Sequence, residues 1–137
     1  LVTIVERKTS FTVSTRVDDK SAKSVTAATI ALLAPFNCAV LTITADNGKE
    51  FAYHEQMTKS LNCDVYFADP YCSWQRGLNE NTNGLLRQYW PKITDFKKVS
   101  QSDVQDVIIK LNDRPRKKLN YKTPARLMAE HMAAIAA

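Results

Sequence analysis

Hydrophobic and polar positions along the chain repeat with two different periods, and the changes between them predict its elements. Residues 1–6 and 11–17 are rich in Val, Ile, Thr and Phe and flank a polar turn, which is typical of an antiparallel hairpin. β-Branched runs at 40–45 and 64–68 predict two more strands. Apolar spacing predicts helices at 22–33, with Ser21 or Asp19 as its cap, at 49–61 and at 77–89, the last after a loop over 71–77. Ser100 and Asp103 form a capping-box-like start of a further helix, whose apolar stripe is Val104, Val107, Ile108 and Leu111. Thr123 and Pro124 are the cap and first residue of the last helix.

The order of these elements indicates the fold class. A hairpin followed by alternating helices and strands predicts a mixed sheet with helices on both faces, that is, a three-layer α/β fold. A length of 137 residues suits one domain, over residues 1–137. The chain begins inside the strand-like run at Leu1, which suggests a trimmed N-terminus.

Composition narrows the class of partner. The chain carries 19 Lys and Arg against 14 Asp and Glu, a net charge of +5 that favours an anionic partner. Its apolar runs fall short of the roughly 18 residues that a membrane span needs, so no membrane partner is expected. Cys38, Cys63 and Cys72 are odd in number and widely spaced, which argues against a zinc site or disulfide framework. We expect three reduced thiols in a cytoplasmic protein.

Asp46 is the first candidate for chemistry. It follows the strand 40–45, and ligands of open α/β sheets gather outside the carboxyl ends of strands. The turn at Asn47 and Gly48 would hold its carboxylate there. The alternative is an ordinary turn aspartate or a helix cap.

Glu80 is the second candidate. On a helix over 76–89, Leu78, Leu85, Leu86 and Tyr89 share one arc, and the opposite side carries Glu80, Arg76, Asn83 and Arg87 beside Gly84. A glycine inside a helix is unfavourable by about 1 kcal/mol relative to alanine, so the close approach of a bulky group would explain it. A carboxylate flanked by phosphate-binding groups suits metal-assisted phosphodiester chemistry. The alternative is a solvated helix face.

Three segments, residues 44–51, 66–71 and 73–89, resemble the integrase-type catalytic core of bacterial insertion-sequence transposases. The resemblance is greatest to the group named for insertion sequence thirty. Residues 111–117 and 121–125 are similar to the end of that family's domain. The resemblance covers nearly the whole chain and implies a ribonuclease-H-like fold.

The resemblance also implies an active site of Asp, Asp and Glu. Asp46 resembles the second acid and Glu80 the third, with 33 residues between them (80 − 46 − 1). Both would be catalytic and would bind Mg²⁺ or Mn²⁺, two ions in the intact enzyme. The first acid is expected on a strand upstream of the hairpin, and no residue here matches it. We therefore expect an inactive fragment and either a distorted sheet or a homodimer or higher oligomer.

The function implied is DNA cleavage at transposon ends followed by attack of the freed 3′-hydroxyl on target DNA. Two alternatives stay open: a non-catalytic DNA-binding or assembly remnant, and a ribonuclease-H-like nuclease without strand transfer. Residues 114–126 hold six basic residues and no acid, as a phosphate-contacting segment or a solvated loop would. The DNA contacts expected are Lys49, Arg76, Asn83, Arg87, Arg114, Arg116, Lys117 and Lys118.

Overall fold

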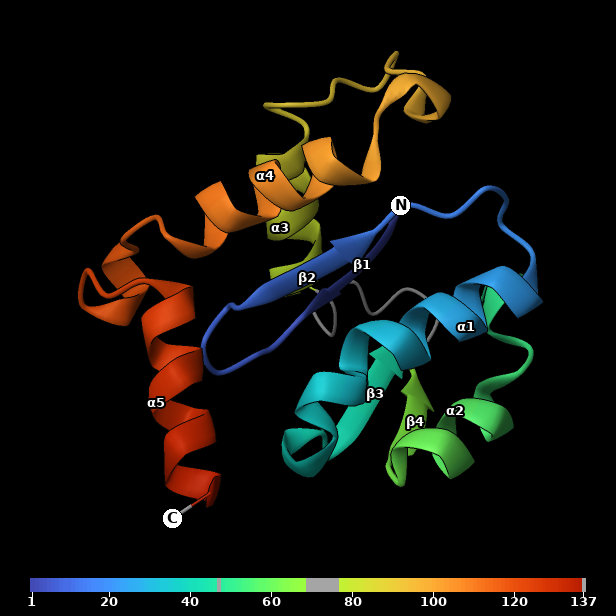
Figure 1. Cartoon of the computed structure of the whole chain (residues 1–137), viewed down its shortest axis with the longest axis horizontal. Helices are drawn as coiled ribbons and strands as arrows, with labels where there is room; N and C mark the ends of the chain where they lie inside the picture. The colour runs from blue at the N-terminus through green and yellow to red at the C-terminus, as the bar shows by residue number, and fades with distance from the viewer. Residues whose placement is uncertain (47, 69–76, 137) are drawn as a thin grey trace. The chain divides into compact units, whose positions relative to one another are not determined.

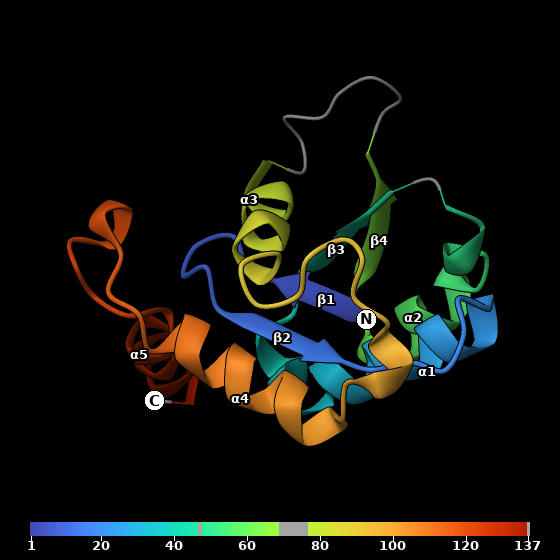
Figure 2. The same ribbon diagram turned by 90° about the horizontal axis from the view of Figure 1, so that it is seen from above.

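The computed structural model describes residues 1–46, 48–68 and 77–136 (Figures 1 and 2). Within the single domain that the sequence predicts, the chain packs as two compact units. The first contains residue 1, residues 3–16 and residues 78 onward, and the second contains Val2 and residues 17–77. A loop is predicted over residues 71–77, and residues 71–76 of it lie outside the described residues.

The first unit opens with the predicted hairpin, formed by β1 (Val2–Val5) and β2 (Thr12–Thr15). So short a connection permits only antiparallel pairing. The Glu6 N–H donates to the Phe11 carbonyl at 2.9 Å, and the Ser10 N–H donates to the Glu6 carbonyl at 2.9 Å. The Glu6 carboxylate accepts both the N–H and the hydroxyl of Thr9, at 2.7 and 2.6 Å. The turn therefore supplies its own polar partners.

The outer edge of β2 is covered by α4 (Gln101–Asn112), which lies beside it (Figure 2). The buried Asn112 amide accepts from the Thr12 N–H at 2.9 Å and donates to the Thr12 carbonyl at 2.8 Å. Gln105 donates to the Ser14 carbonyl at 3.1 Å, and Gln101 accepts from the Arg16 N–H at 2.9 Å. Three amides on one helix thus take the place of a neighbouring strand, which blocks edge-to-edge pairing at β2.

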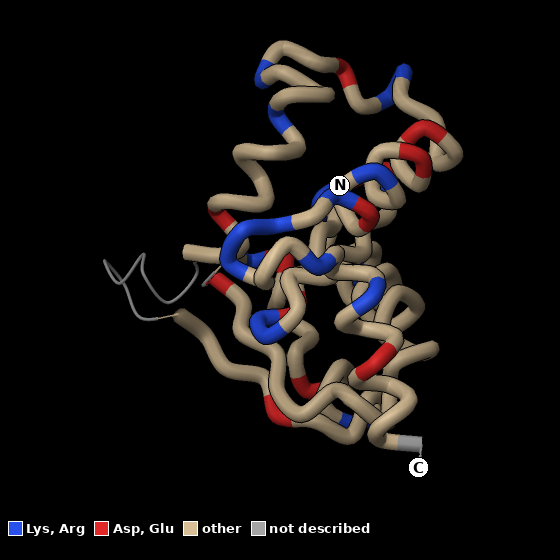
Figure 3. Tube along the Cα trace, turned by 90° about the vertical axis from the view of Figure 1, so that its left-hand side faces the viewer, with Lys and Arg blue, Asp and Glu red and all other residues tan. Residues whose placement is uncertain are grey.

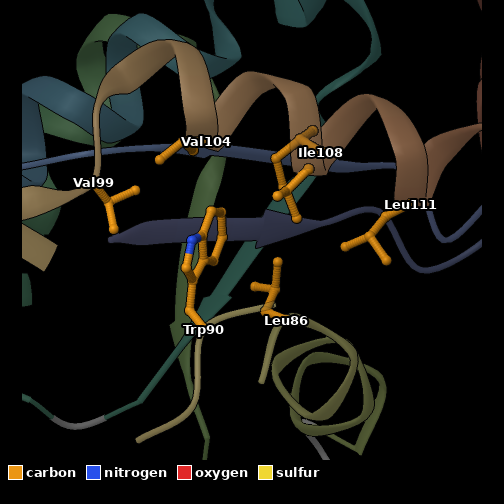
Figure 4. Close-up of a cluster of buried hydrophobic side chains, with 7 residues drawn as sticks. Leu86, Trp90, Val99, Val104, Ile108 and Leu111 are labelled. Atoms are coloured by element: carbon orange, nitrogen blue, oxygen red, sulfur yellow. The ribbon is translucent and has the colours of Figure 1, made fainter. Parts of the chain in front are cut away.

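The hydrophobic core of the first unit joins α4 to α3 (Gly77–Leu86) and to the segment between them (Figure 4). Ser100 and Asp103 form the predicted capping box at the start of α4. The predicted stripe on α4 is buried, as expected. The cluster consists of Leu86, Trp90, Val99, Val104, Val107, Ile108 and Leu111.

The first unit ends with η4 (Phe96–Lys98) before α4, and with η5 (Lys117–Leu119) and α5 (Pro124–Ala136) after it. The Thr123 hydroxyl accepts the Arg126 N–H at 3.1 Å, so the predicted cap at the start of α5 is confirmed. α5 contacts α4. The Thr9 hydroxyl also lies 4.0 Å from the Met128 sulfur, which connects α5 to the hairpin turn.

The second unit places a parallel strand pair against two helices. β3 (Thr42–Ala45) pairs with β4 (Asp64–Phe67) in the register Thr42 to Asp64 and Ala45 to Phe67. α2 (His54–Leu61) contacts β4, and α1 (Ala22–Leu33) contacts α2. The core includes Val25, Leu33, Ala45, Met57, Leu61 and Cys63.

Two predictions for the second unit need adjustment. Ser21 caps α1 as predicted, and the helix continues as η1 (Ala34–Ala39) beyond its expected end. The helix predicted over 49–61 is divided into η2 (Lys49–Phe51) and α2, separated by a turn at Ala52 and Tyr53. α2 ends at Asn62, whose left-handed φ of 51° stops the helix before β4.

The mixed sheet of the sequence prediction is divided. The described strands form two two-stranded sheets, β1–β2 antiparallel and β3–β4 parallel. Both pairing senses of a mixed sheet are present, but no ladder joins them in the described residues.

Candidate active site and nucleic-acid interface

Asp46 lies at the carboxyl end of β3, as predicted. The β3–β4 ladder continues past the strands, because the Ala68 N–H donates to the Ala45 carbonyl at 2.8 Å. The half-buried Asp46 accepts the Gly48 N–H at 3.0 Å through Oδ1. This side-chain-to-backbone turn orients the carboxylate at the end of the strand.

A second carboxylate lies in the same turn. Gly48 is the N-cap residue of η2, and a Cβ added at Gly48 would fall 2.7 Å from Glu50 Oε1. The Glu50 carboxylate is therefore folded back over Gly48, whose N–H Asp46 accepts. From the sequence, Glu50 is a neighbour of Asp46 that could act on its carboxyl or contact DNA, and the geometry of the turn is what places the Glu50 carboxylate over Gly48. The Lys49 side chain is exposed.

Glu80 lies in the first turn of α3 and is exposed. A carboxylate there interacts favourably with the helix dipole. Asn83, Gly84 and Arg87 are exposed with it, so the predicted polar face exists. Arg76, predicted on the same face, lies outside the described residues.

The opposite face of α3 agrees with the prediction and adds one residue. Leu86 is buried, and Leu78, Leu85 and Tyr89 are half-buried. Thr82, which the apolar pattern missed because it is polar, is fully buried. No atom that the structure describes lies within 4 Å of a Cβ built on Gly84, so packing in that part of the chain does not require this glycine.

The residue types fit a divalent cation, but the described set of ligands is incomplete. Carboxylate oxygens are the ligands that Mg²⁺ prefers. Asp46 belongs to the second unit and Glu80 to the first. Across residues 1–46, 48–68 and 77–136, no group of three or more His, Cys, Asp or Glu could hold a metal ion.

The basic segment after α4 is a closed loop. The Arg116 N–H donates to the Lys122 carbonyl at 3.1 Å, and the Tyr121 N–H donates to the Arg116 carbonyl at 2.8 Å. Asn120 and Tyr121 both adopt positive φ, 55° and 63°, at the turn after η5. The loop therefore holds a defined conformation.

Arg116 differs from the basic residues around it. Its side chain is only 9% exposed, and Nη2 donates to the Leu111 carbonyl at 3.4 Å, at the C-terminal end of α4. Burial, together with the neighbouring Arg114, lowers the pKa of the Arg116 guanidinium. The sequence predicted a DNA contact here, but the structure packs Arg116 inside the loop because a cation stabilises a helix C-terminus.

The other predicted contacts of this segment are accessible. Arg114, Lys117 and Lys118 are exposed, and Arg114 donates to the Tyr89 hydroxyl at 3.0 Å. Burial and the nearby Arg116 lower the pKa of Lys118. Glu130 forms ion pairs with two further cations, its carboxylate lying 4.0 Å from Lys122 Nζ and 3.3 Å from Arg126 Nε. The exposed basic residues of the segment that make no ion pair among the described residues, Arg114, Lys117 and Lys118, therefore precede Lys122.

Comparison with solved structures defines the fold. The chain is similar to the catalytic core domain of BIV integrase, with a TM-score of 0.70 and 21% identity, over 96% of this chain and 88% of that one. The fold is therefore that of an integrase catalytic core, a ribonuclease-H-like α/β fold. No protein-family model matches the chain.

Relatives in sequence are transposases of insertion sequences. A transposase for insertion sequence element IS4351 of Bacteroides fragilis is 46% identical over 124 residues, 90% of this chain and 38% of the relative. Transposase InsI for element IS30A of Escherichia coli K12 is 41% identical over 134 residues, 97% of this chain and 35% of the relative. A transposase for element IS1086 of Cupriavidus metallidurans is 40% identical, over 95% of this chain and 39% of the relative.

Over nearly its whole length the chain is similar to these insertion-sequence transposases, as the resemblance implied. It spans a little over a third of the length of these relatives. In the described part of the chain, every helix is too short or too polar to cross a membrane.

Proposed function

We propose that the chain is the catalytic core of a transposase that cuts transposon ends and joins them to target DNA in the bacterial cytoplasm. The observation that carries this proposal is identity of 40–46% to three transposases over nearly the whole chain. The integrase-core fold and a carboxylate fixed at the carboxyl end of β3 support it.

In this proposal Asp46 and Glu80 are metal ligands and catalytic acids. The Gly48 N–H orients the Asp46 carboxylate before any ligand arrives, which reduces the ordering needed at the site. Glu80 is exposed in the first turn of α3, where it is accessible to a metal–DNA complex. When bound, two Mg²⁺ or Mn²⁺ ions would activate the attacking oxygen and stabilise the leaving oxygen.

The polar face of α3 and the basic loop would position the DNA. Asn83 and Arg87 share the exposed face of Glu80, and Lys49 is exposed beside the turn of Asp46. Arg114, Lys117 and Lys118 would bind phosphates farther along the strand, and Arg76 would join them. Arg116 would act by holding the loop in shape, since its guanidinium faces the Leu111 carbonyl.

Catalysis would require a third acid that this chain does not supply. We expect it from a strand upstream in the intact protein, so the chain alone is inactive and works within a dimer or higher oligomer. A second candidate function is a non-catalytic DNA-binding or assembly module. The exposed basic residues after α4, Arg114, Lys117 and Lys118, would suit this candidate as well. The fold alone would also suit a nuclease without strand transfer.

The test joins the preceding part of a relative's sequence to Leu1 and assays nicking and joining of that relative's end DNA. We expect both activities with Mg²⁺ or Mn²⁺. Asp46→Asn and Glu80→Gln should each lower the rate at least about 100-fold, because each removes charge stabilisation at the reacting phosphate.

Asp106→Asn is the matched control, since Asp106 is an exposed acid on α4, and it should leave the rate unchanged. Nicking without joining would favour the nuclease. Salt-dependent DNA binding without either activity, undiminished by loss of both acids, would favour the binding module.

A further inference from the structure

The segment Pro91–Lys98 of the first unit presents an apolar tip to solvent. Ile93 is 95% exposed, the highest value among the large hydrophobic residues that the structure describes. The Thr94 N–H donates to the Pro91 carbonyl at 2.9 Å, which closes a four-residue turn with Lys92 and Ile93 at its centre. Ile93 therefore stands at the apex of a hydrogen-bonded turn.

Both ends of this loop are anchored in the core. The buried Trp90 ring meets the Phe96 ring edge to face, with centroids 6.0 Å apart, and Val99 is buried in the same cluster (Figure 4). Asp95 caps η4 by accepting the Lys97 N–H at 3.0 Å. The large side chains at the base of the loop, Trp90, Phe96 and Val99, pack in the core. Ile93 is therefore exposed at the tip of a loop that is anchored at both ends.

The tip is surrounded by positive charge. Lys92, Lys97 and Lys98 are exposed, and none of them takes part in an ion pair within residues 77–136 as described. The one acid of the loop, Asp95, is engaged in the cap of η4. Basic residues accordingly lie on both sides of this acid along the chain. Figure 3 shows where Lys and Arg lie along the trace.

We propose that this loop, Pro91–Lys98, is a further DNA contact, in which Ile93 enters a groove and the three lysines bind the flanking phosphates. The proposal rests on the function proposed above and adds a site to it. An apolar wedge flanked by cations is how minor-groove proteins unstack and bend DNA. A protein partner would require a wider apolar surface, whereas the neighbouring Trp90 and Phe96 face the core.

The charge part of the proposal is tested by fluorescence anisotropy of this chain with a labelled duplex at several salt concentrations. The triple variant Lys92→Gln, Lys97→Gln, Lys98→Gln should reduce the slope of log affinity against log salt by up to about 2.7, because each phosphate contact contributes about 0.9. All three lysines are exposed, and thermal melting would verify that the variant is folded.

The apolar part is tested with Ile93→Ser. Binding should weaken roughly tenfold, the effect of leaving one isoleucine unburied, while the salt slope stays as in the wild type. DNA bending, followed by energy transfer between dyes at the duplex ends, should decrease. The matched control is Ile109→Ser with Lys110→Gln, an exposed isoleucine and lysine on α4, which should change neither quantity.

The outcomes separate this inference from the proposed function. If the wild type binds DNA and both loop variants bind like it, the loop is no DNA contact, while the transposase proposal stands. Unchanged DNA binding with loss of self-association in sedimentation would assign the loop to a protein contact instead. If the wild type binds no duplex at any salt concentration, both proposals fall.

Discussion

The two strand pairs of the chain are stabilised by different kinds of contact. The β2 edge of the hairpin is bonded to the amides of Gln101, Gln105 and Asn112 on α4. The β3–β4 pair has α2 against β4, with Met57 and Leu61 buried. The backbone polar groups at the β2 edge thus have partners on α4, whereas the β3–β4 pair ends in the half-buried carboxylate of Asp46.

This difference distinguishes the part of the chain that stabilises the fold from the part that carries the candidate catalytic acids. Directional hydrogen bonds to a buried edge specify one register, since a shifted strand would leave polar groups unpaired. In the parallel pair α2 packs against β4, and a local turn orients the half-buried Asp46 carboxylate at the carboxyl end of β3. The hairpin region carries no candidate acid, and the turn after β3 carries two carboxylates, Asp46 and Glu50.

The largest effect should come from the two cores. Leu111→Ala in the first unit and Met57→Ala in the second each remove a side chain with 0% exposure. Each should lower the free energy of unfolding by about 3 kcal/mol, measured by urea denaturation with circular dichroism. If either loss of stability is below about 1 kcal/mol, that unit lacks a close-packed core of its own and the comparison between the two units does not hold.

A smaller effect should follow from the amide row. Asn112→Ala leaves the buried N–H and carbonyl of Thr12 without partners and should destabilise the chain by about 2 kcal/mol. Gln105→Ala removes one partly buried bond and should lower stability by about 1 kcal/mol. Equal losses in urea titrations of the two variants would show that burial of the bond does not matter at this edge.

The smallest effect should be a pH dependence at the hairpin turn. Burial raises the pKa of the Glu6 carboxyl, but hydrogen bonds from Thr9 and Lys8 and the nearby His131 lower it, and the net shift is downward. The folded pKa lies below the unfolded one, so this stabilisation is complete above the unfolded pKa and is lost as pH falls through the folded pKa.

Glu6→Gln should therefore be less stable than the wild type at pH 7, by about 1 kcal/mol, and equal to it at pH 2. Thermal melts across this range measure the difference. A constant difference at every pH would mean that the carboxylate charge contributes nothing and that only shape matters at this turn.

Local signals in the sequence predicted the elements well. Ser21, the Ser100–Asp103 pair and Thr123 each cap the helix that was predicted to begin there. A cap depends on residues within one turn of each other, so the information is contiguous in the chain. The helix predicted over 49–61 was wrong at its start, because the turn at Ala52 and Tyr53 carries no glycine or proline to mark it.

Charge patterning predicted the face of α3 but not the fate of Arg116. Glu80, Asn83 and Arg87 are exposed because the helical period alone separates them from Leu86. Arg116 resembles its basic neighbours in sequence and is buried because the loop after α4 folds back on the helix end. Burial of a charged group depends on what surrounds it in space, which no local pattern contains.

By itself the sequence determined the order of elements, the caps, the helix faces and the likeness to transposases. All of these depend on short-range spacing or on short strings of residues within the segments 44–51, 66–71 and 73–89. Only the tertiary structure decided that α4 closes β2 with three amides, that Glu50 folds over Gly48 and that Ile93 stands alone at a turn. These features arise from contacts between residues distant in the chain or from the path of one turn, and their free energies depend on burial and geometry that exist only after folding.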